Sequence, residues 1–451
     1  MYSFKGKKVL VFGLGLNQGG VGSAKFFANA GAEVRITDLK SKSILQPSID
    51  QLKSFPNISY TLGEHKNEDI DWADLIIKNP SVKRDNPYLD HARRKNKDIE
   101  TDLGIFFKLV DKSKIIGVTG TKGKSTTASL IYAGLKENNQ DVVLAGNIGR
   151  SVLDCIPLVK ENTLVVLEIS SFQLEGLAPL RVSPKYAVVT NIFPDHLNVY
   201  KDMFEYISAK RLITQFQSSS DFLFLNKDDK TLNNPKFTSG LSAKIIFYSK
   251  QDLPKDFKPN LIGEHNLENI AAAFAVSKAF NIDENQMLQS LSSFKGVPFR
   301  MELTGQWNGI KIINDTTATG PDAGIQALNS YPNSIVIAGG MNKNMPYEGY
   351  VKVLEENAKE VFFLEGDSAD LIMSSLRKPK ARRVAERSNL KTHGPYSDLE
   401  KLLEDIKKIA KEGDTILFSP AATSYNLFQN EFDRGRRFNK AVEKVFGEDI
   451  S

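Results

Sequence analysis

Residues 117–127, with the sequence GVTGTKGKSTT, carry the clearest chemical signal in the chain. A short apolar run precedes them and a helix-like run follows, which predicts a strand, a glycine-rich turn and a helix. Such a turn aims backbone N–H groups and a helix N-terminus at phosphate oxygens. Lys124 would then reach the β- and γ-phosphates of a nucleotide, and the hydroxyl of Ser125 or Thr126 would bind Mg²⁺. The spacing departs from the usual P-loop, because Val118 occupies the position of the first glycine.

Two more side chains in the same region are candidates for metal binding. Glu168 ends an apolar run, and a carboxylate at a strand end beside a P-loop suits a second Mg²⁺ contact, although capping of the next helix explains it equally well. His196 also follows an apolar run. A single histidine is more often a structural hydrogen-bond partner, but His196 and His265 are two of only five histidines and both lie in this region. Lys210 lies on a predicted helix and, by itself, is best interpreted as a solvated lysine.

The beginning of the chain has a second, weaker nucleotide signal. Residues 8–13 form an apolar run that leads into GLGLNQGG, and the next apolar run ends at Thr37 and Asp38. In dinucleotide-binding folds an acid at this second strand end holds a ribose hydroxyl. Gln18 stands where the third glycine is expected, so this is an approximate match only. The ligand is as easily a mononucleotide sugar as NAD, and a merely tight strand–helix turn remains an alternative.

Two pairs of polar residues further along the chain also suit a nucleotide. Asn266 and Asn269 lie three positions apart on one face of a predicted helix, where both can address an adenine or a ribose. Helix capping alone also explains Asn266. Arg300 and Asp315 flank a hairpin-length segment and are candidates for clamping nucleotide phosphate and its Mg²⁺, with a surface ion pair as the alternative.

The elements that must position these residues alternate between short apolar strands and helical patterns. That rhythm is typical of βαβ units and a parallel sheet, and 451 residues are too many for one core. We therefore predict an α/β fold of three consecutive α/β domains: a Rossmann-like domain at residues 1–98, a central P-loop ATPase domain at 99–298 and a Rossmann-like domain at 299–451. The expected strands are residues 8–13, 33–38, 74–78, 164–168, 186–190, 221–226, 310–314, 334–338, 360–364 and 415–419.

Composition narrows the class of protein. The net charge of +5 comes from 59 basic and 54 acidic residues, a surplus too small to argue for nucleic acid. The single cysteine, Cys155, excludes an intramolecular disulfide and a zinc ribbon and fits a reducing compartment, so we expect a cytoplasmic protein. The apolar run after Lys8 is broken at once by glycine and predicts a first strand rather than a signal peptide. No apolar run approaches the length of a membrane span.

Taken together and in order, these segments resemble the Mur ligase family, and within it the branch that adds glutamate. The resemblance covers essentially the whole chain. It depends on the motifs GTKGKSTT, the Asn147-Ile148-Gly149 turn, LEISSFQLE, NIFPDH, the helix of Lys210, GEHNLEN, NDTTAT and SPAATSYNLFQNEFDRG. The family's own P-loop has the irregular spacing noted above.

The resemblance implies an ATP-dependent amide ligation. ATP would phosphorylate the terminal carboxylate of UDP-MurNAc-L-Ala, and the amine of glutamate, D-glutamate by the resemblance, would attack the acyl phosphate. Lys124 would stabilise the transferring phosphate and two Mg²⁺ ions would offset negative charge. We expect a monomer that binds these small-molecule substrates, no nucleic acid and no membrane.

The resemblance also assigns roles to residues of this sequence. Catalysis falls to Lys124, Glu168, His196 and Lys210. Metal binding falls to Ser125, Glu168, His196 and Lys210, the last matching the family's carbamylated lysine. ATP binding falls to Gly120, Thr121, Lys122, Gly123, Lys124, Ser125, Thr126, Asn266, Asn269, Arg300 and Asp315. Substrate binding falls to Leu14, Gly15, Thr37, Asp38, Asn147, Ser170, Gln173, Lys343, Ser419 and Ser424.

Three positions depart from the family pattern. The lysine tied to glutamate recognition is replaced by Thr317, and Glu431 stands where an aromatic residue is usual. The turn at residues 79–81 reads Asn-Pro-Ser instead of Ser-Pro-Gly. The alternatives are therefore a related ligase that uses L-glutamate or another amino acid, a folylpolyglutamate-synthetase relative, or an ATP-binding protein without catalytic activity.

Overall fold

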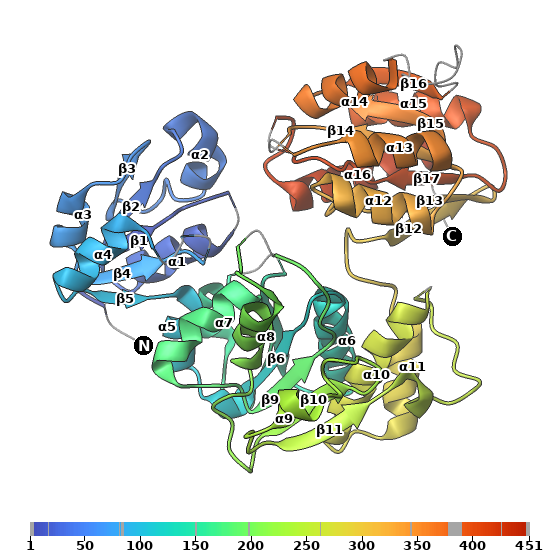
Figure 1. Cartoon of the computed structure of the whole chain (residues 1–451). Helices are drawn as coiled ribbons and strands as arrows, with labels where there is room; N and C mark the ends of the chain where they lie inside the picture. The colour runs from blue at the N-terminus through green and yellow to red at the C-terminus, as the bar shows by residue number, and fades with distance from the viewer. Residues whose placement is uncertain are drawn as a thin grey trace. The chain divides into compact units, whose positions relative to one another are not determined.

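The computed structural model describes residues 4–16, 18–80, 82, 85–148, 151–196, 199–261, 263–342, 345–377, 390–424 and 426–447. The chain divides into two compact units, Met1–Phe294 and Lys295–Ser451, which Figure 1 colours from blue to yellow and from yellow to red. The described residues form three sheets, two in the first unit and one in the second. The predicted class of three consecutive α/β folds is confirmed.

The first sheet is parallel and has the strand order β3-β2-β1-β4-β5. Its order changes direction between β1 and β4, and ligands of such sheets bind outside the carboxyl ends of the strands at that point. Its strands are β1 (Lys8–Phe12), β2 (Glu33–Asp38), β3 (Ile58–Leu62), β4 (Leu75–Lys78) and β5 (Asp98–Glu100). Its helices are α1 (Gln18–Asn29), α2 (Lys42–Asp50), α3 (Asn67–Trp72) and α4 (Pro87–Arg94), and α5 (Asp102–Leu109) leads to the next sheet.

The middle sheet is also parallel, in the order β11-β10-β9-β6-β8-β7. Its strands are β6 (Ile115–Thr119), β7 (Val142–Gly146), β8 (Leu164–Glu168), β9 (Tyr186–Val189), β10 (Phe222–Asn226) and β11 (Lys244–Tyr248). Its helices are α6 (Lys124–Glu137), α7 (Ser171–Leu177), α8 (Met203–Arg211), α9 (Pro235–Thr238), α10 (Glu264–Lys278) and α11 (Glu284–Ser293), with single 3-10 turns at η1 (Lys112–Lys114), η2 (Leu153–Leu158), η3 (Ala178–Leu180) and η4 (Lys250–Asp252).

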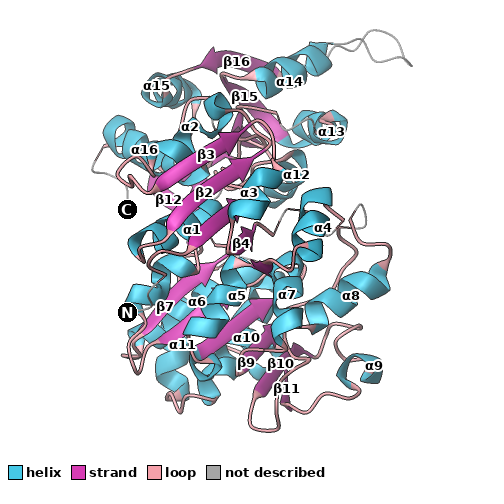
Figure 2. Cartoon of the chain, turned by 90° about the vertical axis from the view of Figure 1, so that its left-hand side faces the viewer, coloured by secondary structure: helices cyan, strands magenta, loops and turns pink. Residues whose placement is uncertain are grey.

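Both faces of the middle sheet are covered. Successive strand residues point to opposite faces, so Ile115 joins one core with α5 and α7 whereas Ile116 joins another with α6, α10 and α11. Figure 2 shows helices on both sides of these strands. Burial on both faces explains why the strands are continuous apolar runs rather than alternating patterns.

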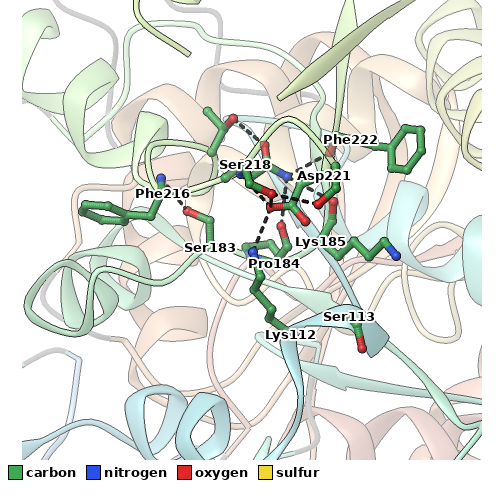
Figure 3. A network of polar contacts seen from close by, with 12 residues as sticks. Lys112, Ser113, Ser183, Pro184, Lys185, Phe216, Ser218, Asp221 and Phe222 are labelled. Carbon is green, nitrogen blue, oxygen red and sulfur yellow. Dashed lines mark hydrogen bonds and ion pairs between the residues drawn. The ribbon is translucent and has the colours of Figure 1, made fainter. Parts of the chain in front are cut away.

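The amino ends of the middle strands are fixed by a saturated polar network, drawn in Figure 3. The buried carboxylate of Asp221 accepts from Lys112 Nζ at 2.8 Å and from the backbone N of Ser218 at 2.7 Å. The side-chain amide of Gln217 donates to the carbonyl oxygens of Pro184, at 2.9 Å, and Phe222, at 3.0 Å. These contacts connect the starts of three neighbouring strands at the edge opposite the glycine-rich turn.

The second unit contains a mixed sheet in the order β12-β13-β17-β14-β15-β16, in which only the pair β12 and β13 is antiparallel. Its strands are β12 (Glu302–Trp307), β13 (Ile310–Asn314), β14 (Ser334–Gly339), β15 (Ala358–Leu364), β16 (Lys391–Tyr396) and β17 (Thr415–Phe418). Its helices are α12 (Pro321–Ser330), α13 (Glu348–Asn357), α14 (Asp367–Arg377), α15 (Leu399–Ile409) and α16 (Glu431–Phe446).

The ten strands given by residue range above are present, with ends shifted by at most two residues, and so is β6, the strand predicted before the glycine-rich turn. The strands not predicted are the edge strands of the three sheets, β3, β5, β7, β11, β12 and β16. An edge strand is paired on one side only and is less buried, so its apolar run is weaker. Strand β16, with the sequence KTHGPY, has no apolar run at all. The described residues contain no helix with the length and apolarity needed to cross a bilayer.

Candidate active site

The glycine-rich turn after β6 takes a backbone shape that only glycine fits. Gly120 has a φ of 147°, and a Cβ there would lie 1.9 Å from Thr190 Oγ1. Gly123 has a φ of 79°, and a Cβ there would lie 2.3 Å from Asn269 Oδ1. Helix α6 begins directly afterwards at Lys124, and the N–H groups of a first helical turn have no partners within the helix. The predicted strand, turn and helix are therefore confirmed, and their geometry suits a phosphate.

The strand end of β9 holds this turn in place. The backbone N of Thr121 donates to Asn191 O at 2.9 Å, and the backbone N of Lys122 donates to Asn191 Oδ1 at 2.8 Å. Thr190 Oγ1 donates to Lys122 O at 2.6 Å. A turn fixed from outside reaches its ligand-binding shape before the ligand arrives, which reduces the entropy cost of binding.

Two lysines converge on one carbonyl oxygen of the turn. Lys124 Nζ donates to Gly120 O at 3.0 Å and Lys210 Nζ donates to the same oxygen at 2.6 Å. Lys210 is 2% exposed, so its interpretation as a solvated lysine was wrong. Burial and the nearby charge of Lys124 lower the pKa of Lys210 to about 7, although Asp195 opposes the shift. At neutral pH a large fraction of the Lys210 amine is therefore neutral.

A tyrosine that the sequence analysis missed connects the buried lysine to the turn. Tyr206 is 1% exposed, its hydroxyl lies 3.2 Å from Thr121 Oγ1, and Lys210 Nζ lies 4.7 Å from its ring centroid. Tyr206 and Lys210 are four residues apart on α8 and so share one helix face. That spacing was the available signal, but it gains meaning only once Lys210 is known to be buried.

Glu168, at the end of β8, is a buried carboxylate that is only half satisfied. It is 2% exposed, and its Oε1 accepts from Asn147 Nδ2 at 2.9 Å. Its Oε2 is buried without a hydrogen-bond partner. Helix α7 is capped by Ser170, in a capping box with Gln173, so the alternative that Glu168 caps this helix was wrong. A buried, unpaired carboxylate oxygen is costly unless a cation binds it, and this donor fits Mg²⁺.

His196 lies beyond β9 and is more open than Glu168. Its backbone has a φ of 54°, and its side chain is 44% exposed. Its ring packs at 5.2 Å, edge to face, on Phe172, the second residue of α7. Within the described ranges no group of three or more His, Cys, Asp or Glu residues is arranged to hold a metal ion. A cation at Glu168 would therefore find at most one further ligand of these types and would need hydroxyls, phosphate oxygens or a modified side chain for the rest.

The two asparagines of α10 are bonded to each other and to the P-loop helix. Asn269 Nδ2 donates to Asn266 Oδ1 at 3.2 Å, and Asn269 Oδ1 accepts from Thr127 Oγ1 at 3.1 Å. Helix α10 begins at Glu264 with Gly263 as its N-cap, so Asn266 does not cap it. The predicted shared face is confirmed, and this face lies against the start of α6.

The carboxyl edge of the first sheet places its predicted residues together. The backbone N of Gly15 donates to Asp38 Oδ2 at 2.9 Å, and that of Lys40 donates to Asp38 Oδ1 at 2.9 Å. The carbonyl of Thr37 accepts from the backbone N of Gly13 at 2.8 Å. Leu14 is fully buried, so only its backbone can face a ligand. Asp38 thus holds the turn after β1 through Oδ2 and the turn after β2 through Oδ1.

In the second unit the strand ends carry Asp315, which is 4% exposed. Burial raises the pKa of Asp315 to about 6, against the hydrogen bonds from Ser419 Oγ, at 2.9 Å, and Met301 N, at 3.1 Å. Arg300 is exposed. Ser424 Oγ is buried and has no hydrogen-bond partner. The predicted Lys343 lies outside the described residues.

Two features of these loops were not visible in the sequence. Thr317 Oγ1 donates to the carbonyl of Phe299 at 2.9 Å, so its hydroxyl is already occupied. Arg434, fully buried on α16, donates from NH2 to Thr316 O at 2.7 Å and from NH1 to Ala422 O at 3.0 Å. It therefore joins the loop after β13 to the loop after β17. The loops after β14 and β17 also pair with each other, through an antiparallel bridge of Met341 with Thr423.

Comparison with known families accounts for most of the chain. Residues 7–100 match the model described as Mur ligase MurD-like, N-terminal domain, residues 118–277 match the Mur ligase middle domain, and residues 299–422 match the Mur ligase, glutamate ligase domain.

Curated relatives are similar over nearly their full lengths. A protein of Roseiflexus sp. named UDP-N-acetylmuramoylalanine--D-glutamate ligase is 35% identical, over 97% of this chain and 98% of its own. A protein of Borreliella afzelii with the same name is 36% identical, over 98% of each chain. Among solved structures, UDP-N-acetylmuramate-alanine ligase from Thermotoga maritima has a TM-score of 0.59 at 22% identity, covering 97% of this chain and 99% of that one. This last likeness concerns the fold alone.

Proposed function

The chain belongs to the Mur ligase family, as an ATP-dependent ligase, and we propose that it joins glutamate to UDP-N-acetylmuramoyl-L-alanine through an acyl phosphate in peptidoglycan synthesis. The observation that carries this proposal is the full-length similarity to relatives named for that substrate and D-glutamate. The site around Gly120 supports it, because two lysines meet at a turn that suits phosphate, and the half-satisfied carboxylate of Glu168 ends β8, the strand paired with β6 before that turn.

We propose that the P-loop, residues 120–126, holds the ATP phosphates. Its turn is fixed by β9, and the N–H groups at the start of α6 suit phosphate oxygens. Lys124, now bonded to two backbone carbonyls of the turn, would release them and stabilise the charge on the transferring phosphate. Asn266 and Asn269 would hold the nucleoside end beside α6. Arg300 and Asp315 belong to the second unit, and their assignment to ATP comes from the family resemblance.

Mg²⁺ would be held by Glu168, whose Oε2 is buried and unpaired, together with Ser125, His196 and a carbamylated Lys210. When bound, the ion offsets negative charge between the nucleotide and the acyl group. The Lys210 amine suits carbamylation because about half of it is neutral at pH 7, so its lone pair can attack carbon dioxide with loss of one proton. We propose two ions, in line with the family.

We propose that the carboxyl edge of the first sheet binds the uridine nucleotide through Leu14, Gly15, Thr37 and Asp38. Asn147, Ser170 and Gln173 lie along the path that the sugar and peptide would take toward Glu168. Asn147 already bonds Glu168 at 2.9 Å, and Ser170 bonds Gln173 at 3.0 Å. These side chains would bind the substrate through the donor and acceptor positions that their present hydrogen bonds leave unused.

For the amino acid we propose the loops of the second unit, with Lys343, Ser419 and Ser424 as carboxylate partners. Ser424 Oγ supports this because it is buried and lacks a partner. Thr317 cannot replace the family's lysine, since it is neutral and its hydroxyl donates to Phe299 O. This one observation favours a second candidate, a ligase of the same family that prefers L-glutamate or another amino acid.

The remaining proposals concern organisation. We propose domains at residues 1–98, 99–298 and 299–451, a monomeric enzyme, and a cytoplasmic reaction, because its ATP and UDP-sugar substrates are made there.

The deciding experiment measures ATP-dependent phosphate release with UDP-MurNAc-L-Ala and a panel of D- and L-amino acids. We expect release with D-glutamate and with no other amino acid of the panel. Release only with L-glutamate would establish the second candidate. ATP binding without release in the presence of any amino acid would contradict both and leave a non-catalytic ATP-binding protein.

A further inference from the structure

A histidine outside every motif above lies at the nucleotide end of the first sheet. His65 follows β3 and is 8% exposed. Its Nδ1 lies 2.8 Å from Thr37 Oγ1, at the end of β2. The residue before it, Glu64, forms an antiparallel bridge with Asp38, so the segment that carries His65 is held along the strand end.

The ring of His65 is fixed on two sides. It stacks on Phe12, the last residue of β1, at 4.1 Å between centroids and 25° between planes. It meets Tyr88 of α4 edge to face, at 5.3 Å and 72°. Because both contacts restrict rotation of the ring, its Nδ1 stays directed at Thr37. The contact with Thr37 is thus built into the packing rather than being an incidental surface contact.

The surroundings of His65 favour a neutral ring. Burial lowers its pKa, opposed by the carboxylates of Asp38 and Asp69. Asp69 is itself paired with Arg35 at 2.7 Å. Thr37 Oγ1 has a second partner, Glu64 O, at 3.2 Å. With a neutral ring, the Thr37 hydroxyl donates its hydrogen bond either to His65 Nδ1 or to Glu64 O. Which of the two it donates to depends on the ring tautomer, and each tautomer fixes one orientation of the hydroxyl.

Thr37 passes this constraint to the turn that follows β1. Its carbonyl accepts from Gly13 N at 2.8 Å, and its neighbour Asp38 accepts from Gly15 N at 2.9 Å. Ser48 Oγ donates to Gly15 O at 2.8 Å on the other side of the turn. His65, Thr37 and the turn at residues 13–15 therefore form one connected hydrogen-bonded unit at the point where the order of the sheet changes direction.

We propose that His65 is a positioning residue for the uridine nucleotide: it orients Thr37 and, through Thr37 and Asp38, the turn after β1. This inference rests on the proposed nucleotide role of the first sheet. His65 touches no reacting atom, so its loss weakens binding of the nucleotide while turnover at saturation is kept.

The test compares substitutions that keep or remove the atom facing Thr37. His65→Asn keeps a polar atom at the position of Nδ1, His65→Gln moves it to the position of Nε2, and His65→Leu removes it. Dissociation constants for UDP are measured by calorimetry on the full chain, with KM and kcat for UDP-MurNAc-L-Ala alongside. His91→Asn is the matched control, because His91 lies on α4 beside the same sheet and its Nε2 contacts Asp71, which is 48% exposed.

We expect His65→Leu and His65→Gln to weaken UDP binding and raise KM roughly 5- to 10-fold, with kcat unchanged, as for one lost hydrogen bond. His65→Asn and His91→Asn should behave like the wild type. A double-mutant cycle with Thr37→Val should be non-additive, since both changes remove the same contact.

Three results would overturn the inference: UDP affinity unchanged in His65→Leu, His65→Asn as weak as His65→Leu, or an effect confined to the melting temperature. A wild-type protein that binds UDP but has no ligase activity would contradict the proposed reaction and leave this inference standing. A wild-type protein that does not bind UDP would contradict the inference itself.

Discussion

The two ends of the middle sheet both carry buried charged side chains, arranged in opposite ways. At the amino ends the ammonium of Lys112 faces the carboxylate of Asp221 at 2.8 Å, and Ser218 adds two further donors (Figure 3). At the carboxyl ends Lys124 and Lys210 share one carbonyl oxygen. There too, Glu168 Oε2 has no hydrogen-bond partner.

The difference between the two ends shows in the pKa values of Asp221 and Lys210. Although burial opposes it, the Lys112 ammonium and the donors of Ser218 hold the pKa of Asp221 below its ordinary value. At the other end, burial and Lys124 lower the pKa of Lys210 to about 7. At the amino ends the buried charge of Asp221 is paired with Lys112, and this pairing stabilises the fold. At the carboxyl ends two lysines lie close together and a buried carboxylate is half satisfied, so an anionic nucleotide and a cation would stabilise these charges. Side chains with strongly shifted pKa values, such as Lys210, are typical of functional sites.

The largest expected effect is that of Lys124→Met at the carboxyl ends of the middle sheet. Loss of the charge aimed at the transferring phosphate should reduce kcat/KM on the order of 1,000-fold. The melting temperature should stay close to that of the wild type, because the bonds from Lys124 Nζ to Gly120 O and Thr121 O can be replaced by bonds from water. A variant that unfolds early, or one that keeps its activity, would show that the two ends do not differ as described.

Lys210→Met should lower the rate roughly 100-fold, as expected for a lost metal contact. Added bicarbonate should not restore activity, whereas high Mg²⁺ should restore part of it. In the wild type, incubation with ¹³C-labelled carbon dioxide should give a carbamate signal by NMR that the variant lacks. Wild-type-like activity of Lys210→Met without any supplement would rule out this role.

Glu168→Gln keeps an acceptor for Asn147 and removes the unpaired negative charge. We expect a loss of roughly 10- to 100-fold in activity, together with a higher Mg²⁺ concentration for half-maximal rate. Unfolding by denaturant should be unaffected or shifted to higher denaturant concentration, since a buried charge is lost. An unchanged Mg²⁺ dependence would separate Glu168 from metal binding.

Lys112→Met tests the amino ends of the middle sheet, and it makes the same side-chain change as Lys124→Met. It leaves the Asp221 carboxylate, which is 2% exposed, without its cation and should lower the free energy of unfolding by about 1–3 kcal/mol. The values of kcat and KM should be those of the wild type. A kinetic defect in a folded Lys112→Met protein would show that the amino ends are coupled to the site.

The smallest effect concerns the pH dependence of that same variant. The pKa of Asp221 is lower in the folded protein than its ordinary 3.8, so its contribution to stability is present above pH 3.8 and is lost as pH falls through the folded value. The stability difference between wild type and Lys112→Met should therefore shrink from pH 5 toward pH 2. Denaturation curves at several pH values measure this, and a constant difference would mean that the ion pair contributes nothing.

Much of the architecture could be read from the sequence because buried parallel strands are continuous apolar runs. Glu33–Asp38, Leu164–Glu168 and Ile310–Asn314 have the predicted ends. The P-loop could be predicted for a related reason: its glycines are required by local backbone shape, as the positive φ of Gly120 and Gly123 demonstrates. Edge strands such as Lys391–Tyr396 could not be predicted from apolar runs, since half of their environment is solvent.

The identity of the site residues could be predicted from the sequence, but their burial and their partners could not. Taken alone in the sequence, Lys210 was best interpreted as solvated and Glu168 fitted a helix cap as readily as a metal, and it was the family resemblance that assigned both to metal binding. Only packing shows that Lys210 is buried over Tyr206 and that Ser170, not Glu168, caps α7. His65 had no sequence signal and Arg434 stood in a family motif without a role, because the partners that give them a role, Thr37 and Thr316, are 28 and 118 positions away.

The sequence by itself determined the order of strands and helices, the glycine-rich turn and the family, all of which depend on local periodicity and on short motifs. The tertiary structure alone decided which charges are paired. Whether a lysine is solvated, paired with a carboxylate or pressed against a second ammonium depends on neighbours distant in sequence and on the loss of water around them. That is why Lys112 and Lys210, alike in the sequence, differ so much in the folded chain.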